Sequence, residues 1–512
     1  MELDLYKRNW TIGALLLSIF LSSLDQTIVS TALPSIVQKI GGLDSVSWVF
    51  TIYMLASTAI MPVVGKLSDM YGRKCFFISG LILFTAGSLL CGFAASMPQL
   101  IAFRGIQGLG AGFLMPITFT LIFTILPQGK AGKFQALFMG VYALSSVVGP
   151  SLGAFITEQL NWHWNFLVNI PFGIASILIV SCSLVESRNE KSSRQVDYAG
   201  AVLLILTTVF LLLAFKLAGG EYSWASWQVV FMLASGGIAL IFFIVIELRA
   251  VEGIIPLQLF CNRTIAGVSA ASFIQGMIMY GAMLYIPFFI QAGLGGDIGD
   301  AGNALTPMMF SVMVGTVIGT MLMKRMSWRG SVLLAICLMG ISSFLFSSLP
   351  LGVNMWYVRG NTALIGIGIG ILMPNAQTAA TFAAPERFKG VATSMVSFFR
   401  TIGGVIGASI TGTLVNQRLA VELLRQASFL KLDPALLEKF SKAKTLIGAN
   451  RMIPEHLALA VRVSLVESIH YGFCFLALAA AVAVPLAFFM GNERFRITKE
   501  VCCSQQMDQS TV

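Results

Sequence analysis

Charged residues are scarce in this sequence. Asp, Glu, Lys and Arg together make up 11% of its 512 residues, whereas soluble globular domains carry about 25%. Hydrophobic residues make up 56%, and the mean hydropathy is +0.83. This balance excludes a soluble globular protein and predicts an all-α polytopic membrane protein.

Residue clusters that could carry enzyme chemistry are also missing. The three histidines (His163, His456 and His470) are far apart, and the eight cysteines lack metal-ligand spacing. A polytopic lipid-modifying enzyme would need a nucleophile, a metal cluster or an acid/base pair at the interface, and we find none that can be defended. A channel is poorly supported too, because no ring of charges or repeated filter loop is visible. We expect no metal and no cofactor.

Apolar runs of about 20 residues, the length that crosses a bilayer, occur fourteen times. The first run lacks a signal-peptide cleavage site and is expected to remain as a span. The predicted spans cover residues 10–33, 47–67, 75–96, 99–125, 134–158, 164–185, 197–217, 227–248, 264–291, 303–323, 330–350, 354–381, 388–415 and 466–490.

The net charge of +10 comes from basic residues in short loops, which set membrane orientation, so we predict no nucleic-acid partner. Lys and Arg gather in alternate loops, which predicts a multi-pass protein of the cytoplasmic membrane with both termini in the cytoplasm. Residues 416–465 depart from this rule, because they face outward on this topology yet carry eight basic residues. Their composition suggests an external helical hairpin or an amphipathic helix on the membrane surface.

A glycine motif of span 4, Gly108 to Pro116, recurs 258 residues later as Gly366 to Pro374. The register persists through the next loop and helix, which a chance glycine cluster would not do. We therefore predict two six-span copies in the same orientation, with spans 7 and 8 as an inserted hairpin; such parallel repeats hold a substrate site between them near the midplane. The predicted units are 1–190, 191–255 (the hairpin), 256–495 and a cytoplasmic tail, 496–512.

Asp25 interrupts the apolar run of span 1. A carboxylate at that depth costs about 2.5 to 3.5 kcal/mol on insertion scales, and such residues mark ion or substrate pathways. Arg104 in span 4 lies at a similar predicted depth, since Asp25 is nine residues from Pro34 and Arg104 six residues from Pro98. An arginine favours the ionised acid and burial favours the protonated one, so the pair suits proton coupling. Alternatively, Arg104 extends to the external interface.

Two further motifs combine small residues with charge or proline. The loop after span 2 carries Asp69 between basic residues, with glycines that permit tight turns, so Asp69 could cap a helix N-terminus and bridge charges. Alternatively, this is an ordinary basic loop that only sets membrane orientation. Span 5 carries small residues four apart and an internal proline, which generic membrane packing could also explain. The residues concerned are Gly65, Asp69, Gly72 and Arg73 in the loop, and Ser145, Gly149, Pro150 and Gly153 in span 5.

The loop, the Arg104 motif and the span-5 motif resemble signatures of the major facilitator superfamily. Residues 24–34 and 162–173 are similar to signatures of its fourteen-span drug/proton antiporters. The resemblance implies that Asp69 and Arg73 latch the cytoplasmic ends of the halves, that Arg104 takes part in proton transfer, and that the span-5 motif marks an exporter. Met70, Ser145 and Ala154 depart from the usual residues, as does His163, which we interpret as structural.

Span 9 corresponds to span 1 in the repeat and mixes methionines, aromatic rings and one amide, which suit varied lipophilic ligands. Core packing is the alternative for any one of these residues, and Arg400 could instead extend to the cytoplasmic surface. Span 13 has no acidic residue, which favours neutral or singly charged substrates. The candidate substrate-binding residues are Gln26, Tyr53, Tyr142, Gln275, Met279, Tyr280, Met283, Asn375, Gln377 and Arg400.

Together these patterns predict a major facilitator fold with 14 transmembrane helices, arranged as two six-helix bundles and an inserted hairpin. The predicted function is proton-coupled export of lipophilic, cationic or neutral, drugs and dyes by alternating access. The partners are then small molecules, protons and membrane lipid, and the protein is expected to be bacterial and to function as a monomer. The same machinery could instead export one dedicated metabolite, such as an antibiotic or a siderophore.

Overall fold

The computed structural model describes residues 5–42, 45–125, 131–184, 196–218, 222–250, 252–290, 298–323, 325–350, 352–430 and 455–491. Within these ranges the chain folds into α-helices with short 3₁₀ turns and forms no β-strand. The all-α prediction is therefore confirmed.

The helices fall into a first half, an inserted hairpin and a second half. The first half contains α1 (Leu5–Ile40), α2 (Trp48–Tyr71), α3 (Arg73–Gly92), α4 (Met97–Ile125), α5 (Ala131–Gln159), α6 (Trp164–Leu167) and α7 (Asn169–Ser183). The hairpin consists of α8 (Tyr198–Leu217) and α9 (Trp227–Arg249). The second half contains η2 (Leu257–Cys261), α10 (Arg263–Phe288), α11 (Ile298–Leu322), α12 (Trp328–Phe346), α13 (Met355–Ala383), η4 (Glu386–Phe388), α14 (Lys389–Leu430) and α17 (Glu455–Phe488).

The helices agree with the predicted spans. In the described part of the chain, 13 helical segments are long and apolar enough to cross a membrane, with α6 and α7 forming one segment. The 29-residue α5 occupies the remaining predicted span, 134–158. The prediction of 14 spans is thus consistent with the observed helices.

The repeated glycine motif packs two distant helices in the same way. A Cβ atom added at Gly108 would collide with the backbone of α2, and one added at Gly110 with the backbone of α3. In the second copy, a Cβ at Gly366 would collide with α11 and one at Gly368 with α12. Small residues let helix backbones approach closely in membranes. Therefore α4 is held between α2 and α3 as α13 is held between α11 and α12.

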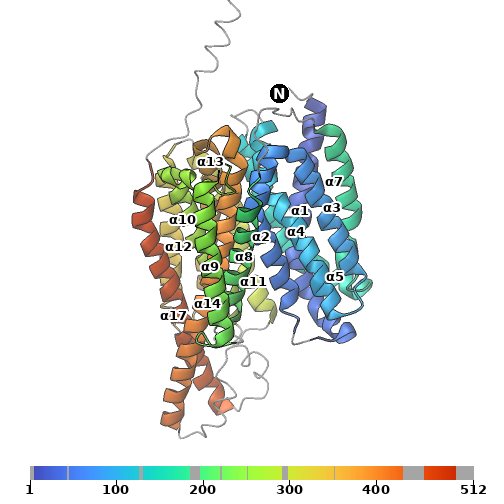
Figure 1. Ribbon diagram of the computed structural model, residues 1–512. Helices are drawn as coiled ribbons and strands as arrows, with labels where there is room; N and C mark the ends of the chain where they lie inside the picture. Colours follow the sequence, from blue (N-terminus) through green and yellow to red (C-terminus); the bar gives the residue numbers. More distant parts are fainter. Residues whose placement is uncertain are drawn as a thin grey trace, which may run out of the picture.

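The two halves stand side by side, the first in blue to teal and the second in yellow to red in Figure 1. They contact each other where α14 packs against α2 and α4 and where α11 packs against α5. The green hairpin lies along this junction, and its α8 contacts both α2 and α14 (Figure 1). The inserted helices therefore touch both halves.

Helices α14 and α17 extend beyond their predicted spans. α14 continues without a break to Leu430, and α17 begins at Glu455, before the predicted start at residue 466. Both extensions project from the end of the second half that lies away from the N-terminus (Figure 1). The flanks of segment 416–465 are thus continuations of spanning helices. Its centre, 431–454, and the tail, 496–512, lie outside the described residues.

Candidate functional site

Asp25 of α1 and Arg104 of α4 form an ion pair inside the first half. Arg104 Nη1 donates to Asp25 Oδ2 at 2.5 Å, and both side chains are 0% exposed. Arg104 Nε also donates to the carbonyl oxygen of Val49 in α2 at 3.3 Å. The structure thus brings together two residues that were expected at one depth, and Arg104 does not extend to the external interface.

Two amides complete the surroundings of the Asp25 carboxylate. Gln107 Nε2 donates to Asp25 Oδ1 at 2.8 Å, while Gln107 Oε1 accepts from Arg104 Nη1 at 2.8 Å. Asn169 Nδ2 in α7 donates to Asp25 Oδ1 at 3.2 Å and to Ser88 Oγ in α3 at 3.0 Å. Both carboxylate oxygens accept hydrogen bonds, so the buried charge is well compensated. Sequence reasoning assigned neither amide a role, although Gln107 lies one turn from Arg104 on the same helix face.

Small residues of α5 set the position of α1 near Asp25. A Cβ atom at Gly149 would collide with the Thr27 side chain, and one at Gly153 would collide with the carbonyl oxygen of Ile28. Ser145 is 0% exposed, one turn before Gly149. The predicted span-5 motif therefore lies largely on the face of α5 that packs against α1. The part of α1 that it contacts comes directly after Asp25 in the sequence.

A central cavity of about 170 Å³ lies between the halves, beside the ion pair. Arg104 lines this cavity, whereas Asp25 does not. Six predicted substrate residues also line it: Gln26, Tyr53, Tyr142, Met279, Tyr280 and Met283. Sequence reasoning missed Thr27, Phe50, Met54, Met308, Met309, Val312, Ile369 and Met373. Mainly thioethers and aromatic rings form the wall, which suits lipophilic ligands of varied shape.

A second cavity, the hairpin pocket, continues from the central cavity. It holds about 410 Å³ and shares Phe50, Met54, Tyr280 and Met283 with the central cavity. Its far wall combines α8 of the hairpin with α14 and ends at Asn416. The two volumes together fall within the 300 to 1,000 Å³ that is usual for drug-sized ligands.

Three predicted substrate amides lie elsewhere and connect helices of the second half. Gln275 Nε2 donates to the carbonyl oxygen of Ile369 at 3.0 Å, which links α10 to α13. Asn375 Nδ2 donates to the carbonyl oxygen of Gly319 in α11 at 3.3 Å. Gln377 Nε2 donates to Ser397 Oγ in α14 at 2.9 Å. All three are almost fully buried and outside the central cavity lining.

Arg400 of α14 does not line the central cavity but lies close behind its wall. Its side chain is only 6% exposed and lies near Tyr142 and Tyr280, which both line the cavity. A position 11 residues after the start of α14 is about 16 Å along the helix, too far for the side chain to extend to the membrane surface.

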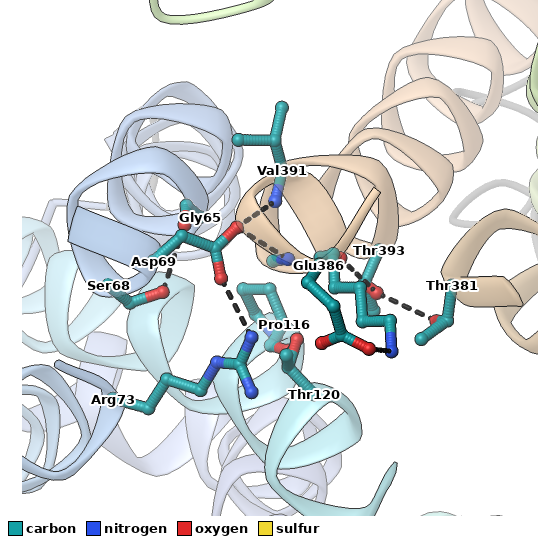
Figure 2. Close-up of polar contacts among 12 residues, drawn as sticks. Gly65, Ser68, Asp69, Arg73, Pro116, Thr120, Thr381, Glu386, Val391 and Thr393 are labelled. Atoms are coloured by element: carbon teal, nitrogen blue, oxygen red, sulfur yellow. Dashed lines mark hydrogen bonds and ion pairs between the residues drawn. The ribbon is translucent and has the colours of Figure 1, made fainter. Parts of the chain in front are cut away.

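Asp69 at the end of α2 joins the two halves (Figure 2). Asp69 Oδ2 accepts from the backbone N–H groups of Gly390 at 2.7 Å and Val391 at 3.1 Å, at the N-terminus of α14. Asp69 Oδ1 accepts from Arg73 Nη2 at 3.0 Å. A helix N-terminus carries a partial positive charge that favours this carboxylate. The predicted latch residues thus meet the second half directly.

Glycines allow this close approach. A Cβ atom at Gly65 would collide with Ser394 and with the backbone of Gly390, and one at Gly390 would lie 2.6 Å from Asp69 Oδ1. Gly72 has φ of 107°, a conformation that separates α2 from α3 and favours glycine. In the corresponding loop of the second half, before α12, Ser327 instead caps its own helix by accepting from the Gly330 N–H at 3.3 Å.

Lys66, also near the end of α2, forms a second long-range contact. Its side chain is 2% exposed, and Nζ lies 2.8 Å from Glu252 Oε2 in the segment between the hairpin and the second half. The ammonium group also lies 5.0 Å from the centre of the Phe388 ring. Sequence reasoning treated Lys66 only as a topology-setting charge, because no local signal links it to Glu252, 186 residues later.

His163, which the sequence suggests is structural, packs against an aromatic ring. His163 stacks on Trp162 with ring centres 3.8 Å apart, and burial together with the charge of Lys39 lowers the pKa of its imidazole. No group of three or more His, Cys, Asp or Glu residues among the described positions could hold a metal ion. These observations agree with a structural role for His163.

Comparisons with known proteins agree with this architecture. The model of a family described as the Major Facilitator Superfamily matches residues 15–408. The multidrug transporter protein MdtP of Bacillus subtilis is 34% identical over 504 residues, covering 94% of this chain and 93% of the relative. Multidrug resistance protein 3 of the same organism is 35% identical over 497 residues, covering 96% and 97%.

A solved structure gives the same result at the level of fold. The bacterial homologue of the human lysosomal transporter Spinster matches with a TM-score of 0.55 and 17% identity, covering 97% of this chain and 100% of that chain. At this identity the likeness shows the fold alone. The family match, the full-length relatives and the shared fold lead to one conclusion: the chain is a multi-pass membrane transporter that belongs to the major facilitator superfamily.

Proposed function

We propose that this transporter exports lipophilic drugs and dyes across the cytoplasmic membrane in exchange for protons. The observation that carries the proposal is the buried Asp25–Arg104 pair beside a methionine-rich and aromatic cavity between the halves. The two full-length Bacillus relatives are named as multidrug transporters, which supports the same substrate class.

Asp25 is the residue that binds the transported proton. Protonation from outside converts the ion pair into a neutral acid beside an arginine that has lost its counter-ion. Arg104 lines the cavity and its guanidinium carbon lies 4.2 Å from the Tyr53 ring centre, so a change in its position reaches the substrate site directly. Asp25 itself does not line the cavity. Proton and substrate therefore compete through Arg104 and Tyr53 rather than by contact with one carboxylate.

In this proposed cycle, the conformation in which Asp69 and Lys66 hold the two halves together is the outward-facing state. On the predicted topology Asp69 and Lys66 lie on the cytoplasmic side, and their contacts with Gly390, Val391 and Glu252 close that side. The hairpin pocket leads toward the opposite side, where Asn416 lies. Release of the cytoplasmic ties and closure of the outer side then expose the cavity to the cytoplasm. All these groups belong to one chain, so we propose that a monomer embedded in lipid performs the cycle.

The decisive experiment replaces Asp25 by asparagine in proteoliposomes that contain a pH-sensitive dye. Asp25→Asn should abolish substrate-driven proton movement while binding of a lipophilic dye such as rhodamine 6G is retained, since the amide mimics the shape of the protonated acid. Glu158→Gln, which neutralises an exposed carboxylate of α5, is the matched control and should behave as wild type. Normal proton exchange by the Asp25→Asn variant would refute the assignment.

Export of one dedicated metabolite by the same residues is the second candidate. The varied wall of methionines and aromatic rings favours broad specificity over this alternative. Energised vesicles tested against a panel of unrelated dyes and drugs separate the two functions. Transport of several unrelated compounds supports multidrug export, whereas transport of a single structural class supports a dedicated exporter.

A further inference from the structure

Arg400 is a buried cation without a counter-ion in the described part of the chain. Its side chain is 6% exposed, and its Nη1 atom is buried without a hydrogen-bond partner. No ion pair between described residues includes Arg400, whereas Arg104 has Asp25. Burial of an unpaired charge is costly, and proteins normally pair such groups. The described residues thus supply no ion-pair partner for this cation, which lies beside a ligand cavity and is free to meet a charged group of a bound substrate.

Backbone contacts between α10 and α14 hold Arg400 beside the cavity wall. A Cβ atom at Gly276 of α10 would collide with the carbonyl oxygen of Arg400, so the two helices touch at this level. One turn further along both helices, a Cβ at Gly404 would collide with the Tyr280 ring. Tyr280 lines both the central cavity and the hairpin pocket. Arg400 therefore lies one helical turn from the residue that packs against this ring, and its guanidinium group is near the phenol groups of Tyr142 and Tyr280.

The charges around the cavity favour a negative group at this position. The residues that line the central cavity include Arg104 and no acidic side chain. The nearby carboxylate of Asp25 already accepts hydrogen bonds from Arg104, Gln107 and Asn169. With that pair counted as neutral, Arg400 adds a positive charge beside the central cavity that no described acidic side chain pairs with.

We infer that Arg400 forms a subsite for the carboxylate of lipophilic acids, so that the transporter accepts amphiphilic anions in addition to other lipophilic compounds. The inference rests on the proposed export function and names a substrate class for the same cavity. The guanidinium group offers planar, paired N–H donors that match a carboxylate. The phenol groups of Tyr142 and Tyr280 add donors nearby, while the methionine wall receives the apolar body of the substrate.

The test compares N-dansyl-phenylalanine with its primary carboxamide, which has nearly the same shape and no charge. Binding to the purified full-length protein is followed by fluorescence at pH 7.5, with protein-free micelles as the blank. Wild type should bind the acid at least tenfold more tightly than the carboxamide. Arg400→Gln should weaken binding of the acid roughly 10- to 100-fold, because a charge-assisted hydrogen bond is lost, and should change binding of the carboxamide less than about twofold. Arg400→Lys should recover part of the affinity.

Arg418→Gln is the matched control, because it removes the same charge from the same helix at a residue that faces Glu422 and Tyr471 instead of the cavity. It should leave both affinities unchanged. The inference is overturned if wild type binds the acid no more tightly than the carboxamide, or if Arg400→Gln weakens both equally. The wild-type comparison decides the question even if Arg400→Gln does not fold. Binding is measured at equilibrium, so failure of proton exchange in the Asp25 experiment leaves this result independent.

Discussion

Replacing Asp69 by asparagine should open the cytoplasmic side of the transporter. The Asp69 side chain is 1% exposed and makes three contacts, two with backbone N–H groups of α14 and one with Arg73. Asparagine keeps one carbonyl oxygen, but it has no charge and its NH₂ group must face either a backbone N–H or the Arg73 guanidinium. The variant therefore loses the interaction with the α14 N-terminus and gains a donor that faces another donor.

The size of the effect follows from these contacts. Hydrogen bonds to charged groups contribute about 1.5–3 kcal/mol each and neutral ones about 0.5–1.5 kcal/mol, so two bonds lose roughly 2 kcal/mol. The helix N-terminus adds up to about 2 kcal/mol in a partly buried geometry. A total of about 2–4 kcal/mol shifts the equilibrium between closed and open cytoplasmic sides roughly 30- to 700-fold.

Native cysteines offer a direct measurement of this shift. Cys75 at the start of α3 and Cys261 just before α10 are exposed and lie in opposite halves, while Cys91 is buried. Spin labels on Cys75 and Cys261, with the other exposed and tail cysteines replaced by serine, report the distance between the halves. Asp69→Asn should move the distance distribution to longer values. Glu386→Gln is the control, because Glu386 is 87% exposed and its surface ion pair contributes little. Identical distributions for wild type and Asp69→Asn would refute the latch.

Two further predictions concern packing and charge. Glu252→Gln should lower the melting temperature in detergent more than Lys66→Met does. Glu252→Gln leaves the ammonium group of Lys66, which is 2% exposed, without its counter-ion, whereas Lys66→Met leaves a carboxylate that is 25% exposed and that water can solvate. Equal losses in melting temperature would contradict this asymmetry. Gly153→Ala should abolish dye export, because the added Cβ would collide with the Ile28 backbone and separate α5 from α1. Gly140→Ala is the control and should export normally, because the nearest atom to its added Cβ is 3.7 Å away. Similar export activity of both variants in vesicles would contradict this prediction.

The fold was largely predictable because the membrane simplifies it. Spanning helices must satisfy their own backbone hydrogen bonds, so apolar length alone locates them. The glycine repeat also predicted that the two halves are equivalent copies, and in the structure Gly108 and Gly366 each pack closely against the backbone of a neighbouring helix. Depth counting brought Asp25 and Arg104 together because both lie a known number of residues from a helix end.

The rest of the site depends on helix rotation and on distant contacts, which local sequence patterns do not contain. Gln275, Asn375 and Gln377 looked like substrate groups, yet each bonds another helix, because polar side chains in a membrane protein readily serve as interhelical contacts. Asn169 reaches Asp25 from 144 residues away, and Glu252 reaches Lys66 from 186 residues away. Only the packed helices identify these partners.

The inserted hairpin contacts both halves, one at each of its ends. At one end Trp224 Nε1 donates to Thr413 Oγ1 of α14 at 2.8 Å, and Ser409 donates to the carbonyl oxygen of Phe215. At the other end Glu252 holds Lys66 of α2. We propose that α2 and α14 separate on the cytoplasmic side during transport and that the hairpin then stays with α14. The hairpin cannot follow both helices, so the Lys66–Glu252 pair must break while the contacts with α14 persist. The wall of the hairpin pocket then moves with the second half, which couples the size of that pocket to the state of the cytoplasmic latch.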